Sequence, residues 1–171
     1  MDYSSLPRYP GKADEPKKMG PQPDHIEDTA FGALTWDSKL HKWRGYSTMA
    51  DGASFPLCIC TLSDLIRPPP FEDAMWDRRL TDESRATLLL LQRSDSALRT
   101  SVARDYWPDF RRWGYEEIAY EAMFQKRLKL NSVIFLAEGG AEIYYDDDGM
   151  VGGHLLVAYL EADGTVRGCN S

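Results

Sequence analysis

Short segments in which apolar residues alternate with polar or small ones follow residue 28. Residues 31–36 and 42–49 show this alternation on either side of the turn signal Asp37-Ser38, and together they predict a hairpin. Asp51-Gly52 is a second tight-turn signal, so residues 55–62 are predicted to form a third strand. Both faces of that third strand are apolar, which is typical of a central or helix-covered strand.

The middle of the chain changes to helical periodicity. Thr81 is predicted as an N-cap, and the apolar stripe that follows comprises Leu88, Leu91, Leu98, Val102 and Tyr106. Serine and aspartate at residues 94–96 predict a division of this helix into two, and Pro108 predicts its end. Residues 115–130 predict a second helix, with apolar positions on one face.

Strand patterns return after the helices, at residues 132–137, 141–145, 154–160 and 165–169. Gly139-Gly140 and Asp163-Gly164 supply turns between them. The order predicts an α+β domain: a mainly antiparallel sheet of about six to seven strands, with a pair of helices inserted between the N-terminal and C-terminal strands. The helices are expected to pack on one face of the sheet.

Residues 1–28 are rich in proline, lysine, aspartate and glycine and lack apolar periodicity. They predict an extended or disordered N-terminal arm. The remaining residues, 29–171, are expected to form a single α+β domain, since a chain of 171 residues suits one domain.

The charge, the length of apolar runs and the cysteine content then exclude some classes of function. The net charge of -7 argues against nucleic acid as the main partner, because phosphate binding needs a basic surface, and it suits a basic protein partner. No apolar run is long enough for a membrane span, and no secretory signal precedes the domain. Cys58 and Cys60 point to the same strand face and are expected to be free thiols, so we expect a cytoplasmic protein.

The densest group of chemically active side chains lies at Asp146, Asp147, Asp148 and His154. The three carboxylates lack the spacing of a calcium loop, so we interpret them as a solvated hairpin loop, with a cation or acid-base site as the alternative. We interpret His154 as a half-buried side chain that fixes the hairpin by a hydrogen bond, with catalysis or metal binding as the alternative. We expect no catalytic residue, bound metal or cofactor.

A group of aromatic and basic residues is predicted in the connection between the helices. Trp107, Arg111 and Trp113 belong to residue types that are enriched in protein interfaces. With Asp146, Asp147 and Asp148 they form the predicted contact set for a protein partner.

The chain resembles a loose set of uncharacterised bacterial α+β domains. The opening motif Phe-Gly-x-Leu-x-Trp-Asp starts at Phe31 and is followed by Trp43 and Gly45. The closing motif comprises the acidic turn, Gly153-His154, Val157 and Asp163-Gly164. Some of these domains look like immunity proteins, which neutralise secreted toxins by binding them, so the resemblance implies a binding function for this chain.

Three functional hypotheses follow. The first is a non-enzymatic immunity protein that neutralises a cognate toxin by direct binding. The second is a small hydrolase or metal-dependent enzyme that uses His154 and the turn formed by Asp146, Asp147 and Asp148. The third is a regulatory or structural subunit that binds a neighbour through its N-terminal arm. The sequence leaves the oligomeric state open.

Overall fold

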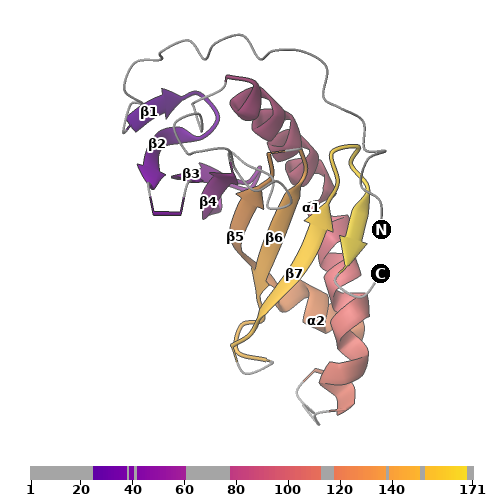
Figure 1. The fold of residues 1–171 in the computed structure, drawn as a ribbon. Helices are drawn as coiled ribbons and strands as arrows, with labels where there is room; N and C mark the ends of the chain where they lie inside the picture. Colours follow the sequence, from indigo (N-terminus) through magenta and orange to yellow (C-terminus); the bar gives the residue numbers. More distant parts are fainter. Residues whose placement is uncertain are drawn as a thin grey trace, which may run out of the picture.

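The computed structural model describes residues 25–37, 39–40, 42–60, 78–112, 118–137, 139–150 and 153–168. Within them the chain forms eight strands and two helices. In chain order these are β1 (His25–Asp28), β2 (Gly32–Asp37), β3 (Lys42–Thr48), β4 (Ser54–Cys60), α1 (Arg78–Arg112), α2 (Glu121–Arg127), β5 (Lys129–Phe135), β6 (Ala141–Asp146), β7 (Leu155–Leu160) and β8 (Val166–Gly168). Figure 1 shows their arrangement.

The strands lie in one sheet in the same order as in the chain. Neighbouring strands are antiparallel except for β4 and β5, which are parallel. The sheet therefore consists of two four-stranded meanders joined by one parallel pair, because the helical crossover returns the chain to the end of the sheet where β4 began. The predicted α+β class is confirmed. The predicted six to seven strands and mainly antiparallel sheet are corrected to a mixed sheet of eight.

Strand β1 is the strand that the sequence pattern did not reveal. Its four residues fall in the predicted arm, because His25, Glu27 and Asp28 give them no apolar alternation. The strand pairs with β2, with Ile26 opposite the fully buried Leu34. Backbone hydrogen bonds to β2 and one apolar side-chain contact thus stabilise β1 as a strand.

The opening motif of the sequence serves packing between β2 and β3. The rings of Trp36 and Trp43 lie with their centroids 5.3 Å apart across the hairpin. A Cβ atom at Gly45 would lie 2.7 Å from Leu34 Cδ2 and 3.0 Å from the Ala33 carbonyl oxygen. Gly45 is therefore required because the Leu34 side chain occupies the space that any larger residue would need.

Helix α1 is a single helix of 35 residues, which corrects three predictions. It starts at Arg78, so Thr81 lies within it rather than capping it. It is not divided at residues 94–96, because Asp95 pairs with Arg99 one turn later while Leu91 and Leu98 on either side are fully buried. It also continues past Pro108 to Arg112, and the burial of Phe110 against Phe124 offsets the hydrogen bond that proline removes.

Helix α2 is shorter than the helix predicted for residues 115–130. It has seven residues, and the chain is already in strand β5 at Lys129, which pairs with Asp146 of β6. Pairing with β6 therefore overrides the helical propensity of residues 129–130. Residues 113–117 of that prediction lie outside the described part of the chain.

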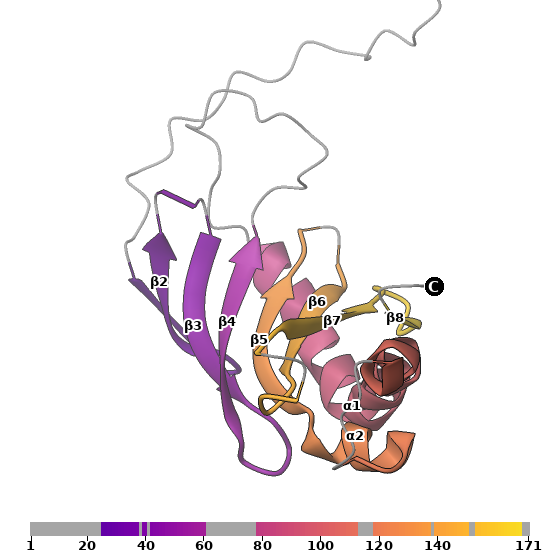
Figure 2. The ribbon, with the colours of Figure 1, turned by 90° about the horizontal axis from the view of Figure 1, so that it is seen from below.

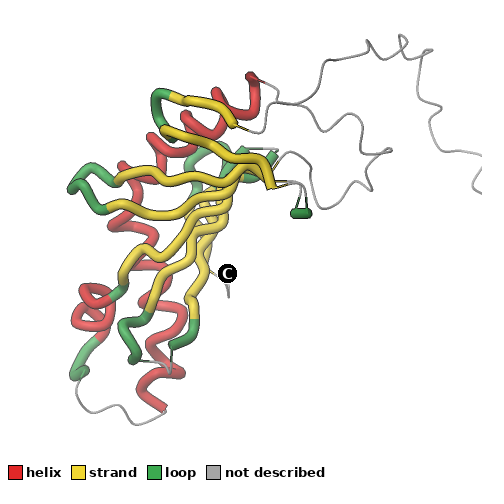
Figure 3. Tube along the Cα trace, turned by 90° about the vertical axis from the view of Figure 1, so that its left-hand side faces the viewer, coloured by secondary structure: helices red, strands yellow, loops and turns green. Residues whose placement is uncertain are grey.

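Both helices lie on one face of the sheet, as predicted (Figure 3). The core fills the space between this face and α1, and its largest fully buried side chains include Trp43, Tyr145, Phe31, Phe55, Phe110, Phe124 and Phe135. No helix in the described ranges is long and apolar enough to cross a membrane.

Helix α1 contacts both meanders along its length. The Gln92 side chain donates a hydrogen bond to the Thr48 carbonyl at the end of β3 (3.0 Å), and Tyr145 Oη of β6 donates one to Asp95 Oδ1 (3.0 Å). Nearer its C-terminal end, α1 brings Asp105 against Gly168 of β8, where an added Cβ would lie 1.6 Å from the carboxylate. The helix therefore ties together strands that have few direct contacts.

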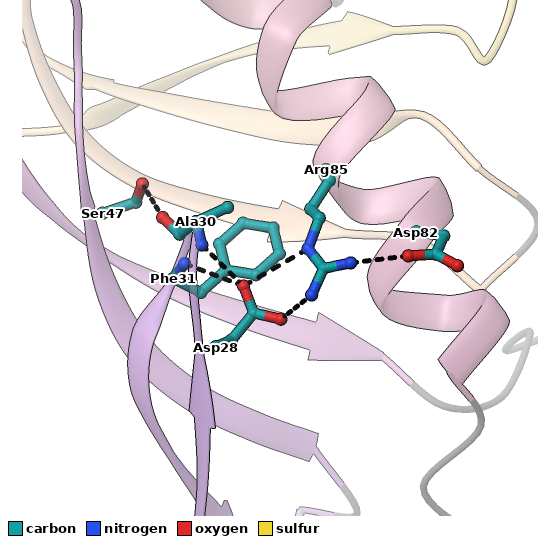
Figure 4. Close-up of polar contacts among 6 residues, drawn as sticks. All are labelled: Asp28, Ala30, Phe31, Ser47, Asp82 and Arg85. Atoms are coloured by element: carbon teal, nitrogen blue, oxygen red, sulfur yellow. Dashed lines mark hydrogen bonds and ion pairs between the residues drawn. The ribbon is translucent and has the colours of Figure 1, made fainter.

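An ion pair fixes the first hairpin to α1 (Figure 4). The Asp28 side chain is almost fully buried, and its Oδ1 accepts hydrogen bonds from the backbone amides of Ala30 (2.8 Å) and Phe31 (3.1 Å). Arg85 Nη2 donates to Asp28 Oδ2, while Arg85 Nη1 donates to the exposed Asp82 (2.6 Å). Burial opposes ionisation of Asp28, but the hydrogen bonds and the charge of Arg85 outweigh it and hold the pKa of Asp28 below its ordinary value.

Replacing Asp28 with asparagine is expected to lower the free energy of unfolding by roughly 1–3 kcal/mol at neutral pH. Because the folded pKa of Asp28 is depressed, its contribution is fully present above the pKa of the unfolded chain and is lost as pH falls through the folded value. Urea unfolding from about pH 6 to about pH 3 should therefore show the difference between wild type and Asp28→Asn shrinking toward zero. Asp82→Asn, which alters an exposed partner of the same arginine, is the control and should change little. A difference that stays constant with pH would contradict this role for Asp28.

Candidate functional site

The sheet has a second face, opposite the helices, that no helix or strand of the described residues covers. Figure 2 shows α1 and α2 on one side only. We call this the uncovered face. The strand register aligns one row of its residues across seven strands: Thr35, Arg44, Cys58, Ile134, Glu142, Tyr159 and Arg167.

A second row on the uncovered face is largely apolar. It includes Tyr46, its partner Pro56, and the pair Tyr144 and Val157, and Leu155 lies two residues before Val157 on the same face of β7. Tyr46 is 68% exposed and Leu155 is 49% exposed. A solvated sheet face normally carries polar residues, and a continuous apolar patch usually marks a binding surface. The uncovered face is therefore the strongest candidate for a functional surface.

The uncovered face is hollowed where the two meanders meet. A groove of about 580 Å³ runs over β2 to β5. Its lining includes Tyr46, Pro56, Cys58 and Ile134, and Arg44 is the charged residue among the described positions that line it. Cys58 is a free thiol, as predicted, and lies half-buried in the groove lining, while Cys60 is buried.

Polar groups on the uncovered face are held by local contacts. Arg44 Nε lies 3.3 Å from Asp37 Oδ2. Tyr144 Oη donates a hydrogen bond to Glu142 Oε2 (2.7 Å). Burial, followed by the hydrogen bond and charge of Glu142, raises the pKa of Tyr144 well above its ordinary value, so this hydroxyl remains a protonated donor. The face thus presents fixed polar groups around an apolar centre.

The acidic turn has a largely structural role. Asp146 Oδ1 accepts a hydrogen bond from the Asp148 amide (2.7 Å), and Asp147 Oδ1 accepts one from the Gly149 amide (2.8 Å). Asp148 is exposed and pairs with Lys129 (2.6 Å) and Arg127 (3.5 Å). These partners, Lys129 foremost, lower the pKa of Asp148. The prediction of a solvated loop fits Asp148 but not Asp147, whose side chain is fully buried beneath the turn.

The candidate ligands do not converge on one point. Across the described ranges, no group of three or more histidine, cysteine, aspartate or glutamate side chains is close enough to hold a metal ion. His154 is exposed and makes no hydrogen bond or ion pair with the rest of the described chain. The predicted half-burial of His154 is therefore wrong, because β7 begins only at Leu155 and His154 precedes the strand. That its ring fixes the hairpin stays a prediction.

The predicted aromatic contact set is only partly exposed. Trp107 is half-buried and stacks on Phe110 at 5.7 Å between ring centroids, and Phe110 in turn packs on Phe124 of α2. Arg111 is exposed on the last turn of α1, and Trp113 lies outside the described residues. Helix α2 connects this group to the acidic turn, because Phe124 contacts Trp107 and Arg127 pairs with Asp148.

Sequence reasoning did not identify the uncovered face. A signal was present in β7, where Leu155, Val157 and Tyr159 alternate with the buried Leu156, Ala158 and Leu160, so the strand is apolar on both sides. Such a strand is ordinarily expected to be covered on both faces. Only the structure shows that, among the described elements, helices cover just one.

No protein-family model, curated protein or solved structure matches this chain. The resemblance to the uncharacterised bacterial domains therefore remains a prediction from short motifs. In the structure those motifs supply turns and packing, as Gly45 and Trp43 of β3 do against β2.

Two substitutions distinguish residues of the acidic hairpin that stabilise the fold from residues that are merely exposed. Asp147→Ala is expected to lower the free energy of unfolding by roughly 1–3 kcal/mol, because it removes a buried acceptor from the Gly149 amide. His154→Ala is expected to change it by less than about 0.5 kcal/mol, as for other exposed side chains. Urea denaturation of both variants against wild type measures the difference. A large loss in His154→Ala would show that the imidazole has a contact absent from this structure.

Proposed function

We propose that this chain is a non-enzymatic protein-binding domain, and that it acts as a cytoplasmic bacterial immunity protein that neutralises a cognate toxin by direct binding. The observation that carries the proposal is the uncovered face, with its apolar groove and exposed Tyr46 and Leu155. The resemblance of the sequence to domains that include immunity proteins supports the specific assignment.

The chemistry of the uncovered face suits a protein partner. Stable interfaces have an apolar centre, a polar rim, and a few aromatic anchors that contribute most of the binding energy. Tyr46, Tyr144 and Tyr159 supply such aromatic groups, while Arg44 and Glu142 supply polar groups on the same face.

Charge complementarity supports a basic partner. The net charge of -7 favours encounter with a positively charged protein. Asp146 extends the uncovered face at the end of β6, opposite Leu155, and Asp148 is exposed in the turn that follows. The sequence-predicted contacts Asp146 and Asp148 thus border the proposed surface, whereas Trp107 and Arg111 belong to the helical side of the molecule.

Co-expression with the product of the adjacent gene tests the proposal. The expected result is that the neighbouring product arrests growth when expressed alone, and that this chain restores growth and co-purifies with it. A neighbour that is harmless and forms no complex would remove the immunity assignment. Rescue of growth without a stable complex would contradict neutralisation by direct binding.

The double variant Tyr46→Ser/Leu155→Ser tests which surface binds. We expect partner affinity to fall at least tenfold, because exposed aromatic and apolar anchors commonly dominate interface energetics. The matched control is Tyr120→Ser/Leu89→Ser, which removes a tyrosine and a leucine of similar exposure outside the uncovered face. Isothermal titration calorimetry measures both variants. Unchanged affinity in the first variant, or an equal loss in the control, would contradict the placement of the site.

A further inference from the structure

A second cleft lies on the helical side of the molecule, away from the uncovered face. It is bounded by the turn between β3 and β4, by the middle of α1, and by the junction of α2 with β5. Its volume is about 570 Å³, within the range of small-ligand sites. We call it the Arg99 cleft.

The topology explains why the cleft exists. The parallel pairing of β4 with β5 begins only at Leu57 opposite Val133. The first residues of both strands precede this pairing, and the register of β5 shifts between Leu130 and Ser132. The two meanders therefore separate at this end of the sheet, and Phe55 of β4 and Leu130 of β5 both line the opening.

Arg99 is a cation held in a fixed position in the cleft. Its Nε donates to Asp95 Oδ2 (2.7 Å), its Nη1 donates to the Leu128 carbonyl, and its guanidinium lies 5.2 Å from the centroid of the Tyr145 ring. Its Nη2 makes no hydrogen bond with the described part of the chain, and its side chain is one-quarter exposed. A guanidinium fixed by three contacts with a donor to spare is pre-organised for an anion.

Two lysines add to the cations that line the cleft. Lys126 and Lys129 lie beside the carboxylates Asp51 and Asp95. Asp95 pairs with Arg99 and Lys129 Nζ pairs with Asp148 (2.6 Å), whereas Lys126 makes no ion pair with any described residue. The ammonium of Lys126 and the spare Nη2 donor of Arg99 are therefore the groups most available to an anion.

We propose that the Arg99 cleft binds a carboxylate attached to an apolar body. The carboxylate is held by Arg99, Lys126 and Lys129, and the apolar body lies against Met49, Phe55 and Leu130. Two sources share this chemistry: a free small-molecule carboxylate, or an acidic residue of a bound protein partner with a neighbouring apolar side chain.

Titration of the full chain with hexanoate, followed by ¹⁵N–¹H NMR, tests this assignment without any partner. We expect saturable shifts at the amides of Arg99, Lys126 and Lys129 with a millimolar Kd, the scale for so small a ligand. Hexylamine, with the same body and the opposite charge, should shift none of them. Absence of saturable hexanoate shifts, or equal shifts with hexylamine, would overturn the proposal.

Variants provide the second readout. Lys126→Gln/Lys129→Gln should weaken hexanoate binding roughly fivefold, because two exposed cations are lost. The matched control Lys39→Gln, in the turn between β2 and β3 at the opposite end of the sheet, should leave the Kd unchanged. An unchanged Kd in the double variant would show that the cleft cations do not bind the carboxylate.

Competition between hexanoate and a purified partner distinguishes the two possible origins of the bound carboxylate. If saturating hexanoate weakens the complex, the carboxylate belongs to the partner; if it does not, the ligand is a free small molecule. Either result follows from a cleft that binds carboxylate. Failure to find a partner would affect only the proposed function, since the titration uses this chain alone.

Discussion

The structure depends on helix α1, because it packs across the two halves that the sheet joins through a single parallel strand pair. The meanders β1 to β4 and β5 to β8 share one parallel pairing, which begins only at Leu57 and Val133. Helix α1 crosses both, with Arg85 paired to Asp28 at β1 and Asp95 bonded to Tyr145 at β6. Burial of apolar residues such as Leu91 and Leu98 beneath the helix supplies the main stabilisation, and the polar contacts fix its position.

This arrangement also determines where binding surfaces can arise. Since both helices lie on one face, the outward residues of the central strands, Ile134, Tyr144 and Val157, remain on the uncovered face. The short pairing between the meanders leaves hollows at the seam, with an apolar groove on one side and the Arg99 cleft on the other. Both proposed sites are therefore consequences of how the two halves join.

Local sequence patterns predicted the elements that local forces define. The hairpin of β2 and β3, the α+β class, the helices on one face and the glycine turn at Gly139-Gly140 could all be predicted from alternation and turn residues. The unbroken α1 could not, because the burial of Phe110 against α2 outweighs the local effect of Pro108. The same limit applies to the sites, because the burial of Asp147 and the exposure of Tyr46 depend on contacts between distant segments. The cluster of carboxylates in the sequence thus predicted contact residues in a turn, but in the structure Asp146 and Asp147 accept hydrogen bonds from backbone amides of that same turn.

We propose that a protein partner occupies the uncovered face. Hydroxyl-radical footprinting of the complex with the adjacent gene product tests it most directly, because it reports the solvent exposure of individual side chains. Tyr46 and Tyr120 are both well exposed in the free chain, at 68% and 59%. We expect Tyr46 to become protected in the complex while Tyr120 stays reactive. Protection of Tyr120 with Tyr46 still reactive would contradict it and place the interface on the helical side.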